Sequence, residues 1–119
     1  MTRPLRPADA ADVRRALAEH AAGRATSADV RLLVKHFLAV LSAVAPGRSV
    51  EVRVPPYAAA QVVPGVRHTR GTPPAVVELD AETWIALASG DLSWADAEDR
   101  GRVLASGERA DLAPYLPLM

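Results

Sequence analysis

The chain has 119 residues, half of them apolar and only 4% aromatic, which is enough for one domain with a core of Ala, Val and Leu. Its 14 basic and 14 acidic residues balance, so it lacks the basic excess with which nucleic-acid-binding proteins neutralise phosphates. The absence of cysteine excludes disulfides, thiolate nucleophiles and thiolate metal sites.

The N-terminus is charged and rich in proline, without the apolar run of a signal peptide. No stretch approaches the roughly 20 apolar residues that a membrane-spanning helix needs. We therefore expect a cytoplasmic protein without stable membrane insertion. Because Pro4 and Pro7 interrupt regular structure, we predict a flexible arm over residues 1–8 and a single domain over residues 9–119.

Two helices are predicted at the start of the domain. Residues 9–22 carry an apolar residue every fourth position and are followed by Gly23, a typical stop. The second helix begins where Thr26 and Asp29 have capping-box spacing, and it ends at Gly47. Its apolar residues follow the 3.6-residue period and form one broad stripe that must be buried, namely Val30, Leu33, Val34, Phe37, Leu38, Leu41 and Val44.

The apolar period then changes to two, which indicates strands. Residues 50–54 alternate valine with polar residues, residues 57–63 form a second run, and residues 75–79 form a third. A polar loop over residues 66–74 separates the last two.

Caps and glycines divide the last third of the chain into short elements. Asp80 is a predicted N-cap, and Ser93 has capping-box spacing to Asp96. The elements predicted here are a helix through Ala88, a short helix that ends at Gly101, a strand over residues 102–106 and a helical turn over residues 112–116. The whole order favours an α+β class, with helices packed on one sheet.

Residues 76–118 carry a distinctive pattern of acidic turns and glycine steps. Its parts are Asp80, Gly90-Asp91-Leu92, Gly101-Arg102-Val103 and Gly107. This pattern resembles the signature end of sterol carrier protein type 2 (SCP2-like) domains. Residues 68–74 and 106–111 look more specifically like a short actinobacterial branch labelled sterol carrier family protein.

The resemblance implies an SCP2-like fold, with about five strands in a curved, mostly antiparallel sheet covered by helices. It also implies an apolar tunnel for sterols, fatty acids or other lipids. It brings no catalytic residue and no cofactor, so we expect a carrier rather than an enzyme. No two of the three histidines stand three or four residues apart, so no zinc site is predicted.

The candidate ligand site is an apolar cavity between the second helix and the sheet. Its predicted wall residues are Val34, Phe37, Leu38, Leu41, Val52, Val54, Val62, Trp84, Leu87, Trp94 and Leu116. Small residues opposite large ones leave space, but the same surfaces also interlock in an ordinary core. Candidate head-group contacts are His68, Arg70 and Thr72, where Arg70 suits a carboxylate or phosphate and the alternative is a structural loop.

Besides an enzyme or an enzyme accessory domain, which would require a cleft that holds His68 with a perturbed pKa and a nucleophile within reach, two functions remain open from the sequence. The first is non-enzymatic binding or carriage of a fatty acid, lipid or sterol in the apolar cavity. The alternative is a protein-interaction or regulatory module that keeps the fold without a usable tunnel, with a protein partner or a second copy as its ligand.

Overall fold

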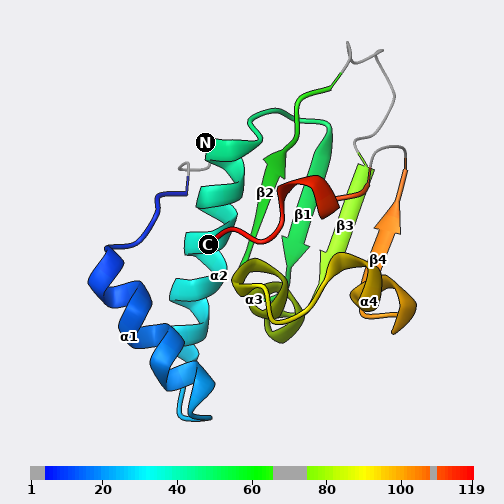
Figure 1. Cartoon of the computed structure of the whole chain (residues 1–119). Helices are drawn as coiled ribbons and strands as arrows, with labels where there is room; N and C mark the ends of the chain where they lie inside the picture. Colours follow the sequence, from blue (N-terminus) through cyan, green and yellow to red (C-terminus); the bar gives the residue numbers. More distant parts are fainter. Residues whose placement is uncertain (1–4, 66–74, 108–109) are drawn as a thin grey trace.

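The structure is a computed structural model that describes residues 5–65, 75–107 and 110–119. Figure 1 shows its helices and strands in an order that confirms the predicted one. They are α1 (Ala10–Ala21), α2 (Ser27–Val44), β1 (Val50–Val54), β2 (Ala58–Val62), β3 (Ala75–Leu79), α3 (Ala81–Ser89), α4 (Trp94–Asp99), β4 (Val103–Ser106) and a 3₁₀ turn, η1 (Ala113–Tyr115).

The strands form one mixed sheet in the order β2-β1-β3-β4. β1 pairs with β2 and β3 pairs with β4 in antiparallel fashion, whereas β1 and β3 are parallel. Val52 lies opposite Ala60 on one side and Val77 on the other. The α+β class is confirmed, but in the described ranges the sheet has four strands rather than five. The fifth strand came from the family resemblance, because the residues themselves show only four runs with a strand period.

The helices gather on one face of the sheet. Figure 1 shows α2, α3 and the C-terminal segment on the same side of the four strands. Val50, Val52 and Val54 point to this side and are fully buried. Glu51 and Arg53 lie on the opposite face, where the Arg53 Nε donates to Glu51 Oε1 at 2.8 Å. The alternation in β1 therefore separates a packed face from a polar one.

The N-terminal segment contacts the helices. Leu5 and Ala8, within the segment predicted as an arm, pack partly against the core. The Ala8 N–H donates to Nδ1 of His36 on α2, at 2.9 Å.

A buried carboxylate joins the first two helices. The Asp29 N–H donates to the Thr26 hydroxyl and the Thr26 N–H donates to the Asp29 carboxylate, each at 3.1 Å, which confirms the predicted capping box. Arg15 on α1 donates to Asp29 Oδ1 at 3.0 Å. The Thr26 N–H, followed by the Arg15 guanidinium, lowers the pKa of Asp29 below its ordinary value of 3.8.

Because of this lowered pKa, the free energy of unfolding depends on pH in the acidic range. A carboxyl group whose pKa is depressed in the folded state stabilises that state above its unfolded pKa, and the contribution is lost as pH falls through the folded pKa. We expect Asp29→Asn to destabilise the protein at pH 7, and the difference from wild type to shrink well below pH 3.8. Urea unfolding across this range tests it, with exposed Asp12→Asn on α1 as the control. A difference that is independent of pH would contradict the assignment.

Candidate functional site

The side chains predicted as a wall between α2 and the sheet are packed in the core. Phe37 has 1% exposure, and the others on these elements have none. They are Val34, Phe37, Leu38, Leu41, Val52, Val54 and Val62. Because six of these side chains have no exposed surface, the part of the chain that the structure describes leaves no open space beside them for a lipid tail. A cavity between α2 and the sheet stays a prediction, and it requires these side chains to separate.

Trp84 secures α3 to α2. Its ring is fully buried, and its Nε1 donates to the carbonyl oxygen of Val34 at 3.2 Å. A buried indole needs such a partner for its N–H. Trp84, one of the predicted wall residues, therefore holds two helices together on the same face of the sheet.

Substitutions at Leu38 test how completely this space is filled. We expect Leu38→Ala to lower the free energy of unfolding by about 2–5 kcal/mol, because it leaves a cavity. We expect Leu38→Trp to lower it by about 1–3 kcal/mol, because the core has no room for the larger ring. Urea unfolding measures both, with Val44→Trp at a 58% exposed position of α2 as the control. Unchanged stability of Leu38→Trp would show that space exists there.

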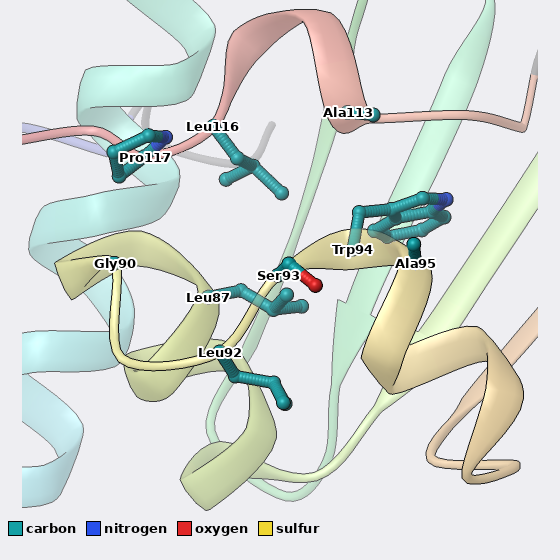
Figure 2. Close-up of a pocket in the computed structure, with 9 residues that line it drawn as sticks. All are labelled: Leu87, Gly90, Leu92, Ser93, Trp94, Ala95, Ala113, Leu116 and Pro117. Carbon is teal, nitrogen blue, oxygen red and sulfur yellow. The ribbon is translucent and has the colours of Figure 1, made fainter.

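An open apolar cleft lies instead between α3, the start of α4 and the C-terminal segment. Its volume is about 370 Å³, within the size range of small-molecule sites. Figure 2 shows Leu116 extending from the C-terminal segment toward Leu87 and Trp94. The lining residues are Leu87, Gly90, Leu92, Ser93, Trp94, Ala95, Ala113, Leu116 and Pro117.

A tight turn between α3 and α4 forms one wall of the cleft. Gly90 ends α3 in the left-handed conformation, with φ of 92°, which favours glycine. The Leu92 N–H donates to the Ala86 carbonyl at 3.2 Å and closes the turn. Ser93 then caps α4 by accepting the Asp96 N–H at 3.1 Å. Leu92 and Trp94 are thereby held on either side of this cap.

The C-terminal segment forms the roof. Leu112 is fully buried and anchors its start, and η1 follows. Farther along, the Leu118 N–H donates to the Ala88 carbonyl on α3 at 2.8 Å. This bond crosses the cleft's edge and keeps Leu116 and Pro117 over α3.

The lining is uncharged. Among the described residues that line the cleft, Ser93 has the only polar side chain besides the indole of Trp94, and its hydroxyl already caps α4. The Trp94 Nε1 is buried without a hydrogen-bond partner in the described parts of the chain. Figure 2 shows this nitrogen at the end of the ring away from Leu87 and Leu116, so carbon atoms of the ring face those leucines.

The structure thus divides the predicted site residues into two groups. Leu87, Trp94 and Leu116 line the cleft, where Leu87 and Trp94 also belong to the buried core, and the other eight predicted wall residues lie in the core away from it. His68, Arg70 and Thr72 fall outside the described residues, so their head-group role stays a prediction.

Several lining residues were missing from the predicted site. They are Gly90, Leu92, Ser93, Ala95, Ala113 and Pro117. The Gly90-Asp91-Leu92 step and the apolar C-terminus were visible in the sequence, but nothing there indicated that the two segments meet.

No group of three or more His, Cys, Asp or Glu side chains has a metal-binding arrangement within residues 5–65, 75–107 and 110–119. In the same ranges, no helix has the length and apolar character required to cross a membrane.

Comparison with known protein families shows to which family the chain belongs. The family described as bacterial SCP ortholog matches residues 24–118, which include every residue that lines the cleft. The chain belongs to this bacterial SCP ortholog family. The resemblance to sterol carrier protein-like domains is therefore confirmed over α2 and everything that follows it. A comparison with curated proteins found no match.

Proposed function

We propose that the protein binds an apolar ligand in the cleft between α3, α4 and the C-terminal segment, and performs no chemistry on it. The uncharged cleft of about 370 Å³ is the observation that carries the proposal. Membership of the bacterial SCP ortholog family, a lipid-carrier type of fold, supports the same class of ligand.

Burial of apolar surface supplies the affinity. Each 100 Å² of ligand surface removed from water contributes about 2.5 kcal/mol. The half-buried Leu92 and Leu116 still expose apolar surface to the cleft, so a ligand there covers both partners. Ser93 is occupied as a helix cap, and the described lining offers no acid, base or free nucleophile that would make the site catalytic.

A second function is favoured by the closed core. The absence of exposed surface on Val34, Leu38 and Val52 supports the proposal that the family fold is kept here without a usable tunnel between α2 and the sheet. On this proposal the protein is an interaction or regulatory module, and apolar small molecules do not bind it.

The two tryptophans provide a direct test. Trp84 reports on the space between α2 and α3, and Trp94 reports on the cleft. We expect titration with 1-decanol to shift the indole N–H resonance of Trp94 in a ¹⁵N-labelled sample and leave that of Trp84 in place. A shift of both would indicate opening of the core, and a shift of neither would favour the interaction module. Trp94→Phe assigns the two resonances.

Filling the cleft tests the same site by mutation. Ala95 is exposed at the start of α4 and lines the cleft, so Ala95→Trp should block the ligand while the core stays intact. We expect at least a tenfold loss of 1-decanol affinity, which corresponds to about 1.4 kcal/mol. Ala43→Trp, at an exposed position of α2 outside the cleft, is the matched control. Equal binding by both variants would place the ligand elsewhere.

A further inference from the structure

The described lining of the cleft is uncharged, and two exposed aspartates are next to lining residues in the sequence. Asp91 stands between the lining residues Gly90 and Leu92, and its side chain is exposed. Asp96 is also exposed, and its N–H bonds to the lining residue Ser93. Two carboxylates therefore belong to residues that adjoin the lining, and none of the described lining residues is a cation that could balance them.

This charge arrangement acts differently on neutral and anionic ligands. A hydroxyl or ether loses less hydration free energy than a carboxylate when it leaves water, and it carries no net charge for Asp91 or Asp96 to repel. A carboxylate loses much more hydration in an apolar site without a partner, and Asp91 and Asp96 repel it as it approaches. The repulsion is screened by salt because both carboxylates face solvent.

The volume limits the size of the group that enters. A water molecule takes up roughly 30 Å³, and a methylene group is of similar size. A cleft of about 370 Å³ therefore holds about a dozen non-hydrogen atoms of a ligand. This matches a medium-length alkyl chain or one end of a larger lipid. Leu116 and Pro117 of the C-terminal segment bound the cleft on one side. A whole sterol is larger than the remaining space and would protrude from it.

We propose that this cleft selects uncharged apolar ligands, namely a neutral alkyl chain or the neutral end of a larger lipid, against fatty-acid anions of the same length. The selectivity rests on the proposed function, because it requires a ligand in the cleft. It assigns Asp91 the role of a specificity residue next to the lining of the cleft.

Two ligands that differ only in the head group test the selectivity. We expect 1-decanol to bind at least tenfold more tightly than decanoate at pH 7.5 and low salt, since the carboxylate lacks a partner in the cleft. The shift of the Trp94 indole resonance measures both affinities. The gap should narrow when sodium chloride is raised to 0.5 M, because the charges of Asp91 and Asp96 are then screened.

A charge-neutralising variant locates the cause. We expect Asp91→Asn to strengthen decanoate binding about two- to threefold and to change 1-decanol binding by less than that, because the alcohol carries no charge. Asp12→Asn removes the same charge from an exposed position on α1 and should change neither affinity, because α1 contributes nothing to the cleft.

The outcomes separate the two proposals. If 1-decanol and decanoate shift the Trp94 resonance with equal affinity, or if decanoate binds more tightly, the proposed selectivity is wrong. Binding of an apolar ligand in the cleft then still stands. If Asp12→Asn acts as strongly as Asp91→Asn, the effect is one of net charge and the role of Asp91 is wrong. If neither ligand shifts Trp94 at its solubility limit, both the selectivity and the proposed cleft function are wrong.

Discussion

Burial of the apolar stripe of α2 against the valines of the sheet is the constraint on which the other contacts depend. Leu33, Leu38 and Val52 have no exposed surface. α1 packs on α2 through the Arg15–Asp29 pair, and α3 is bound to α2 through the Trp84 indole. With α2 held this closely to the strands, the apolar cleft lies where α3 and α4 meet the C-terminal segment.

Much of the fold was predictable because its signals are local. The period of 3.6 residues in α2 and the alternation of valine in β1 follow directly from which side chains must be buried. Thr26 and Asp29 marked the start of α2 through the hydrogen bonds that a helix end requires. The parallel pairing of β1 with β3 was not predictable in this way, because it joins segments that are distant in the chain. The fifth strand, which only the family resemblance implied, is not found among the described residues, and no run of residues supported it.

The site was predictable only in part, and for a physical reason. A core and a lipid cavity are lined by the same kinds of side chain, so the apolarity of Leu38 or Val52 does not tell whether the space beside them is filled. The cleft depends on a long-range contact, the hydrogen bond from Leu118 to Ala88. Trp94 and Leu116 were predicted as wall residues, whereas Leu92 and Pro117 were not, because only the folded path of the C-terminus brings them over α3.

The roof of the cleft and the core beneath it should open on different timescales. The last residues are tied to α3 through the Leu118 amide, the side chain of Leu118 is half-buried, and Met119 is 70% exposed. A segment with so few buried contacts detaches with a smaller free energy than global unfolding, whereas the amide of Val52 exchanges only when the sheet itself opens. Hydrogen exchange at Leu118 therefore measures how often the cleft is uncovered. The shape of the cleft is thus coupled to a local equilibrium of the C-terminal segment rather than to the stability of the whole domain.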